Sequence, residues 1–218
     1  MSVYFISDLH LGGQYAFRFY GRPFKSYRHF EETIIANMHS CVSRNDDIYF
    51  IGDYIDYDKL TERSGTWEHA MSLTQSLPGR KHLVLGNNEE RLIGDRFQGF
   101  EDFKEYALSC GFIDCTKSSV VKVKGNIFYL DHYLEHARTD MLNLYGHVHR
   151  GRSVSIRGFN VSCDLTGYYP LSDMQLIAIL DRELTYSLRQ GHIPDGKYLD
   201  RELWDKYRNT WMKYINQL

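Results

Sequence analysis

Residues Leu83–Arg91 read L-V-L-G-N-N-E-E-R and join an apolar segment to a run of amide and acid side chains. The apolar residues predict a buried strand, and Gly86 allows the backbone to turn sharply where that strand ends. Asn87, Asn88 and Glu89 then follow the strand together. Because ligand sites of open α/β sheets collect outside the carboxyl ends of the strands, this stretch is placed where a site would form.

Short segments rich in Val, Ile, Tyr and Phe alternate with helix-like stretches in the first half of the chain. The strands are predicted at Val3–Ile6, Asp47–Ile51 and His82–Leu85, and the helices at His29–Val42, Trp67–Leu77 and Phe100–Cys110. The second half is richer in strands, predicted at Val120–Val123, Ile127–Leu130, Leu142–Tyr145 and on both sides of Gly158. This order of elements predicts an α/β fold with two packed sheets.

The composition is that of one globular domain. Of 218 residues, 43% are hydrophobic, which is ample for a core, and the net charge of -2 gives no overall attraction to nucleic acid or anionic membrane. The four cysteines form no C-x-x-C pair, which is typical of reduced thiols in the cytoplasm. No apolar run approaches the ~20 residues of a membrane span. We therefore expect a cytoplasmic protein without a membrane partner.

The last part of the chain predicts a separate element. Apolar side chains recur every three or four residues on one face of a predicted helix, at Leu199, Leu203, Tyr207, Trp211, Ile215 and Leu218. We expect residues 1–194 to form the domain and residues 195–218 to form an amphipathic helix packed on it. A partner or dimer contact is the alternative, so monomer and homodimer both stay open.

Metal-binding residue types follow several predicted strands. They occur in Asp8-Leu9-His10, Gly52-Asp53-Tyr54-Ile55-Asp56, Gly86-Asn87, Asp131-His132 and Gly146-His147-Val148-His149. In an extended D-x-H or H-x-H segment both ligands point to one side of the strand. Carboxylate, amide and imidazole donors without thiolate suit manganese, iron, nickel or zinc. The number of donors exceeds the needs of one catalytic ion, so two ions that share a carboxylate are expected, with Asp53 as the bridge.

Taken together, these motifs resemble those of the calcineurin-like metallophosphoesterases, which run D-x-H, G-D-x-x-D, G-N-H-D/E, a lone His and G-H-x-H. They extend from Asp8 to His149, and the segments Arg18–Phe24 and Asn160–Pro170 also resemble a small bacterial and phage branch of the family. The resemblance implies a four-layered α-β-β-α sandwich of two mixed sheets with flanking helices.

The resemblance also implies a ligand set and a mechanism. The first ion would be held by Asp8, His10, Asp53 and His149, and the second by Asp53, Asn87, His132 and His147. The cofactors would be two divalent ions, of which we expect Mn²⁺ first and Fe, Ni or Zn as alternatives. A water bridging the ions would attack phosphorus. In the family, the acid that corresponds to Asp56 orients the histidine of the third motif.

This chain has Asn88 where the family most often has that histidine. Asparagine donates hydrogen bonds but cannot protonate a leaving alkoxide, a contribution usually worth ~10² to 10⁴ in rate. We therefore expect phosphodiesters or phosphoanhydrides, of cyclic nucleotide, nucleotide or nucleic-acid type, to be favoured. One alternative is a phosphomonoesterase in which another group, such as His132, His136 or a metal-bound water, supplies the proton. The other is a catalytically silent scaffold that binds a partner protein.

Three arginines are candidates for binding the substrate phosphate. Arg18 and Arg22 follow the first motif in a segment that also carries Phe17, Phe19, Tyr20 and Phe24, a mixture that suits nucleotides. An ordinary solvated loop is the alternative for this segment. Arg91 follows the third motif, where it could reach a phosphate or form a salt bridge within its own loop.

Overall fold

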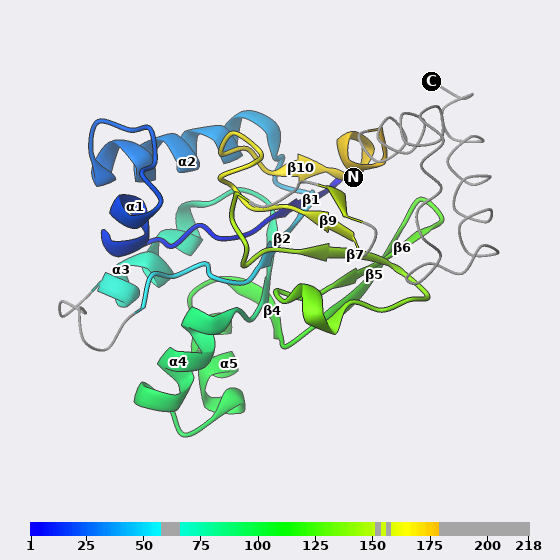
Figure 1. The fold of residues 1–218 in the computed structure, drawn as a ribbon. Coiled ribbons are helices and arrows are strands. Elements are labelled where there is room, and N and C mark those ends of the chain that lie inside the picture. Colours follow the sequence, from blue (N-terminus) through cyan, green and yellow to red (C-terminus); the bar gives the residue numbers. More distant parts are fainter. Residues whose placement is uncertain (58–65, 151–153, 156–157, 179–218) are drawn as a thin grey trace.

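The computed structural model describes residues 1–57, 66–150, 154–155 and 158–178 (Figure 1). The first sheet has the order β10-β1-β2-β3-β4, in which β1 to β4 are parallel and β10 is antiparallel to β1. Its strands are β1 (Val3–Ile6), β2 (Asp47–Ile51), β3 (Arg80–Val84), β4 (Phe112–Thr116) and β10 (Leu171–Ser172). The helix expected at residues 195–218 lies outside the described residues.

The second sheet has the order β5-β6-β7-β9-β8 and mixes parallel with antiparallel pairs. Its strands are β5 (Ser119–Val123), β6 (Asn126–Leu130), β7 (Leu142–Tyr145), β8 (Val154–Ser155) and β9 (Gly158–Asn160). The hairpin of β5 and β6 turns at Lys124 and Gly125, both with positive φ, as the sequence indicated. The two mixed sheets confirm the predicted α/β sandwich.

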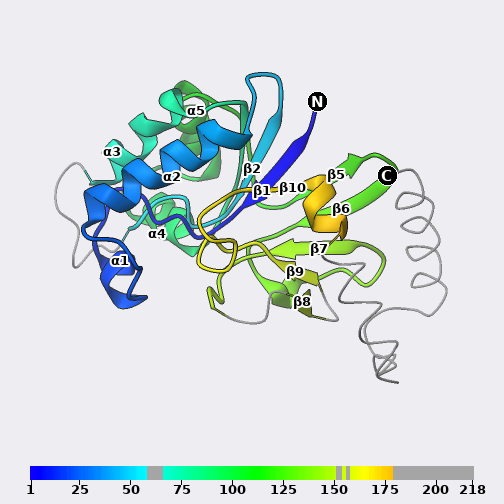
Figure 2. The same cartoon turned by 90° about the horizontal axis from the view of Figure 1, so that it is seen from above.

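Helices cover the face of the first sheet that points away from the second sheet (Figures 1 and 2). They are α1 (Tyr15–Phe19), α2 (Tyr27–Cys41), α3 (Thr66–Leu73), α4 (Asn87–Arg96) and α5 (Phe100–Ser109), with a 3-10 turn at η1 (Thr74–Ser76). Another 3-10 turn, η2 (Leu134–His136), connects β6 and β7 of the second sheet. The helix expected at 67–77 thus becomes a 3-10 turn after Leu73, where Thr74 is buried against the Tyr54 hydroxyl, 3.0 Å away. In the described residues, no helix is long and apolar enough to cross a membrane.

The interior strands β1 and β2 are buried on both faces, which explains their nearly continuous apolar sequences. In β1, Ile6 packs in the core under the helices, while Val3 and Phe5 pack in the core between the sheets. In β2, Phe50 packs under the helices and Ile51 packs between the sheets. This alternation sandwiches the first sheet between α-helices and the second sheet.

The ends of the strands converge at one place. Since β1, β2 and β3 are parallel, the loops that follow them leave the sheet at the same edge. Immediately after β1, Ser7 forms a parallel bridge with Ser162, which follows the last described strand of the second sheet in sequence. The amide of Ser7 donates to the carbonyl of Val161 at 3.1 Å. Loops from both sheets therefore meet beside Ser7.

Candidate metal centre

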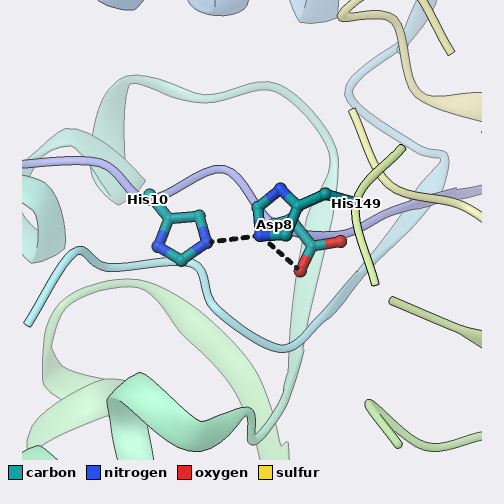
Figure 3. Close-up of side chains that lie close together, drawn as sticks. All are labelled: Asp8, His10 and His149. Atoms are coloured by element: carbon teal, nitrogen blue, oxygen red, sulfur yellow. Dashed lines mark hydrogen bonds and ion pairs between the residues drawn. The ribbon is translucent and has the colours of Figure 1, made fainter. Parts of the chain in front are cut away.

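The residues expected as metal ligands lie together where these loops meet. Two groups of buried donors, Asp8–His10–His149 and Asp8–Asp53–His132, have ligand atoms within 4.8 Å of one another. Figure 3 shows the first group, in which Asp8 and His10 come from the loop after β1 and His149 from the loop after β7. Donors that are far apart in sequence thus share one small volume.

Around the first expected ion, nitrogen and oxygen atoms point at a common centre. The Nε2 atoms of His10 and His149 are 3.3 Å apart, and His149 Nε2 is 3.8 Å from Asp8 Oδ1 (Figure 3). Asp53 Oδ2 lies 3.5 Å from His10 Nε2. Such spacing between four donors is what one shared cation requires.

The donors expected around the second ion lie close to the amide oxygen of Asn87. This oxygen lies 3.3 Å from His132 Nε2 and 2.9 Å from His147 Nδ1. Asp53 Oδ1 lies 3.5 Å from the same His132 nitrogen. Asp53 therefore turns one carboxylate oxygen toward each group, the orientation that a bridging ligand needs.

The protonation of the histidines suits metal binding. His132 Nδ1 lies 2.9 Å from the carbonyl oxygen of Ile51, and His149 Nδ1 lies 2.7 Å from Asp164 Oδ2. With each Nδ1–H donated to these acceptors, the neutral ring presents the lone pair of its Nε2 to the site. The Nε2 atom of His132 faces two acceptor oxygens, those of Asn87 and Asp53, so either a proton on this nitrogen or a metal cation stabilises the arrangement.

Electrostatics at the site point the same way. Burial alone would lower the pKa of His132, but the Asp53 carboxylate outweighs it and raises that pKa to about 10. Burial lowers the pKa of His10 to about 4, which keeps this imidazole neutral. Burial opposes ionisation of Asp53, yet His132 and His10 hold its pKa well below its usual range. His132 is thus protonated without metal, and a divalent ion would displace this proton when it binds.

The backbone at the expected ligands is unusual. Positive φ values are rare for non-glycine residues and mark strained conformations. Here Asp8 (59°), His10 (50°), Asp53 (50°), His147 (70°) and His149 (42°) all have them. These residues account for most of the non-glycine positive φ values in the described part of the chain. Such clustering is typical of a functional site.

Glycines before three of the motifs make room for the donors. A Cβ at Gly52 would overlap the His132 ring, and a Cβ at Gly86 would overlap the Asp53 amide and carboxylate. A Cβ at Gly146 would lie 2.8 Å from Asp8 Oδ2. A side chain at any of these three positions would displace an expected ligand, so glycine is required there.

Comparison with known proteins decides the family. A family model described as calcineurin-like phosphoesterase matches residues 1–210. The chain belongs to this family. The uncharacterized protein MJ1445 of Methanocaldococcus jannaschii is 24% identical over 180 residues, which cover 83% of this chain and 92% of that protein. The crystal structure of AQ665, a protein of unknown function from Aquifex aeolicus, has a TM-score of 0.59 at 21% identity and covers 82% of this chain and 98% of that one. That likeness supports the fold.

In this calcineurin-like phosphoesterase, Asn88 is buried and bonded to the backbone. Its side-chain oxygen accepts from the backbone amide of Tyr57 at 2.9 Å, and the backbone amide of Asn88 donates to Asp53 Oδ1 at 2.9 Å. Asn88 thus links the third motif to the loop that carries Asp53. The sequence did not indicate this bonding, because Tyr57 lies far from Asn88 along the chain.

Glu89 has a role that the sequence analysis did not assign. Its buried carboxylate accepts from the amides of Asp53 (2.9 Å), Ile55 (3.1 Å) and Gly86 (2.8 Å). Burial and the charge of Asp53 raise the pKa of Glu89 to about 7. Its position three residues after Gly86 matches half of a capping box, which is the signal that could have identified it.

Asp56 contacts the first motif. Its Oδ1 lies 3.8 Å from His10 Nδ1, and its Oδ2 accepts from the amides of Tyr15 at 3.0 Å and Ala16 at 3.3 Å. Burial raises the pKa of Asp56. The resemblance linked Asp56 to a third-motif histidine, whereas this carboxylate joins His10 to the start of α1.

Of the three arginines expected to bind substrate, Arg22 has a buried side chain that contacts the backbone of the first motif. Its enclosed guanidinium donates to the carbonyls of Asp8 (2.6 Å) and Leu9 (2.7 Å) and pairs with Asp164 at 3.1 Å. Arg22 is thus positioned to brace the first motif rather than to face substrate. Arg18 on α1 and Arg91 on α4 are exposed.

Asp164 completes this brace and was also missed. Its carboxylate joins Arg22 to His149 Nδ1, and burial is outweighed by these partners, which hold the pKa of Asp164 well below its usual range. The sequence did not mark Asp164, since Arg22 comes from the segment between α1 and α2 and His149 from the loop after β7.

Proposed function

We propose that the chain is a dinuclear-metal phosphoester hydrolase that favours phosphodiesters or phosphoanhydrides. The carrying observation is the convergence of the whole expected donor set on two centres that share Asp53. A scaffold without catalysis has no need of buried, strained carboxylates and histidines in this arrangement. Mn²⁺, a cytoplasmic location and a monomer or homodimer are part of the same proposal.

Each residue has a part in this proposal. Two divalent ions held by the donor set would bind phosphate oxygens and supply the attacking water. Asp53 would bridge the two centres, while Asn87, His132 and His147 would complete one and Asp8, His10 and His149 the other. Glu89 holds the backbone at Asp53 and Gly86, and Asp164 holds the His149 ring, so that the substrate meets a preorganised site.

Substrate preference follows from Asn88. Its oxygen is engaged by the Tyr57 amide, and an amide group has no acidic proton to give. The alcohol of an ordinary phosphomonoester leaves as a strongly basic alkoxide and needs such a proton. A phosphate leaving group, or the strained oxygen of a cyclic ester, needs less help.

The test compares substrates with matched leaving groups. Wild-type protein with Mn²⁺ should hydrolyse bis-p-nitrophenyl phosphate faster than p-nitrophenyl phosphate, and a cyclic nucleotide faster than its monophosphate product. Asn88→His should narrow the gap for the alkyl pair, because it returns an acid. A wide wild-type preference for monoesters would refute the proposal.

A phosphomonoesterase is the second candidate, and the Asp131–His136 pair favours it. His136 Nδ1 lies 3.1 Å from Asp131 Oδ1, with the histidine side chain 58% exposed. A ring oriented by a carboxylate can act as an acid through its other nitrogen. If His136→Gln lowers monoester turnover at least about tenfold while diester turnover is kept, this candidate replaces the first.

A further inference from the structure

Two aromatic side chains on α1 are exposed beside the metal centre. Tyr15 is 53% and Phe19 is 67% exposed, and their rings stack with centroids 5.7 Å apart and an interplanar angle of 14°. We call this pair the α1 platform. Exposed aromatic rings that stack on one another form a contiguous apolar surface, and such surfaces mark binding sites.

The platform is continuous with the candidate centre. Phe19 packs edge-on against Tyr20, with centroids 5.0 Å apart and planes at 90°. Tyr20 in turn lies face to face on His149, with centroids 3.6 Å apart and planes at 20°. A series of ring contacts therefore leads from an expected metal ligand to the open surface. A group bound on the platform would lie next to a phosphate at the centre.

Contacts at both ends of α1 fix the platform relative to the centre. Asp56, which lies against His10, accepts from the first amides of the helix. Beyond the helix, Arg22 is anchored to the carbonyls of Asp8 and Leu9. The loop after β1 runs directly into this helix (Figure 1). Binding on a surface that is already ordered costs little conformational entropy.

Charge near the platform suits an anionic ligand. Arg18 lies on the same helix with its side chain exposed, where its Nη2 donates to Gln14 at 2.8 Å. Arg150, directly after His149, is also exposed and donates to the Gly21 carbonyl at 3.3 Å. Aromatic rings flanked by cations form the combination that binds bases and phosphates together.

We infer that the α1 platform is a stacking subsite for the base of a nucleotide-containing substrate. This inference rests on the proposed phosphoester hydrolysis, because the phosphate of that substrate would occupy the metal centre. Every base has a π-face, so such a subsite binds nucleotides without requiring one sequence. The protein would then prefer phosphoesters of nucleosides over esters of simple alcohols.

Binding measurements test the subsite without relying on turnover. We would titrate the Mn²⁺-loaded protein with adenosine 5'-monophosphate and with ribose 5-phosphate, which lacks the base, by calorimetry. Wild-type protein should bind the former at least about fivefold more tightly, the low end for one stacked base. Phe19→Ala should remove this difference and Phe19→Trp should keep it. Ile113→Ala, which removes a 53% exposed side chain on β4, is the matched control and should change nothing.

Kinetics separate this inference from the proposed function. The ratio of kcat/KM for thymidine 5'-p-nitrophenyl phosphate over methyl p-nitrophenyl phosphate should fall at least about fivefold in Phe19→Ala. Normal hydrolysis with equal binding of the two monophosphates would overturn the subsite alone. A base preference without hydrolysis of any ester would overturn the proposed function alone. If wild-type protein self-associates in sedimentation and Phe19→Ala does not, a second copy covers the platform and the inference fails.

Discussion

The two acids of the second motif differ in their surroundings and should differ in importance. Asp53 turns an oxygen toward each group of donors, whereas the Asp56 carboxylate lies near His10 and accepts from the backbone of α1. Asp53→Asn should remove nearly all activity and lower the bound metal measured by elemental analysis. Asp56→Ala should cost about 10- to 100-fold, as for residues that orient a ligand. Equal losses in both variants would show that Asp56 takes part directly.

Asp164 offers a second test at the level of one side chain. It accepts from His149 Nδ1 at 2.7 Å, so Asp164→Asn should lose the charge that fixes the ring and weaken metal binding by about 10- to 100-fold. Metal titration followed by calorimetry measures this. Asp140→Asn, at a 54% exposed side chain paired with Arg138, is the control. Unchanged metal affinity in Asp164→Asn would mean that Arg22 alone positions the loop.

At this scale, the proximity of the expected ligands could be predicted from the sequence because each follows a strand end. Their supports could not, because a brace such as Asp164 or Glu89 is defined by partners in other loops. Arg22 illustrates the difference: its place among aromatic residues indicated a substrate contact, and only the fold shows that its guanidinium reaches the carbonyl of Asp8. Residues that belong to a local sequence motif can be predicted, whereas supporting residues that are recognised only by their partners in other loops cannot.

Among the elements, the turn between β3 and α4 packs directly against Asp53. Gly86→Ala would push a Cβ into Asp53, although the backbone of Gly86 is extended and suits any residue. We expect about 10²-fold lower activity from misplacement of Asp53. The measurement is kcat/KM together with thermal unfolding.

Gly94→Ala on the same helix is the matched control. A Cβ there meets nothing within 4 Å, and alanine is favoured over glycine in a helix by roughly 1 kcal/mol. This variant should therefore be as active as wild type and slightly more stable. Similar losses from both substitutions would indicate that α4 tolerates no change, rather than that Gly86 makes room for Asp53.

Elements with strong apolar patterns were predicted well. The bounds of β1, β2 and β7 agree with the sequence prediction, because these strands are buried on one or both faces. α4 was missed because its first turn is polar and Gly94 interrupts it, and β4 because its Asp114 breaks the apolar pattern. Buried elements have an apolar pattern that can be recognised in the sequence, whereas an edge strand or a polar helix start lacks such a pattern.

On the scale of the whole molecule, the centre joins the two sheets. Asp8, His10 and Asp53 follow strands of the first sheet, and His132, His147 and His149 follow strands of the second. Each strand end could be recognised in the sequence, but the pairing of β10 with β1 and of β9 with β7 depends on contacts between distant segments. A cation held by donors from both sheets would fasten them to each other.

Divalent metal should therefore stabilise the whole fold. A ligand that binds only the folded state at 100 times its dissociation constant adds ~2.7 kcal/mol, which raises Tm by roughly 5–10 °C in a protein of this size. We expect this rise when Mn²⁺ is added to chelator-treated protein, measured by calorimetric unfolding. Asp53→Asn should show little of it, because it loses the carboxylate that both groups share, while Glu105→Gln, at an exposed position on α5, should behave as wild type. An equal rise in all three proteins would place the bound metal elsewhere on the surface and argue against a centre that bridges the sheets.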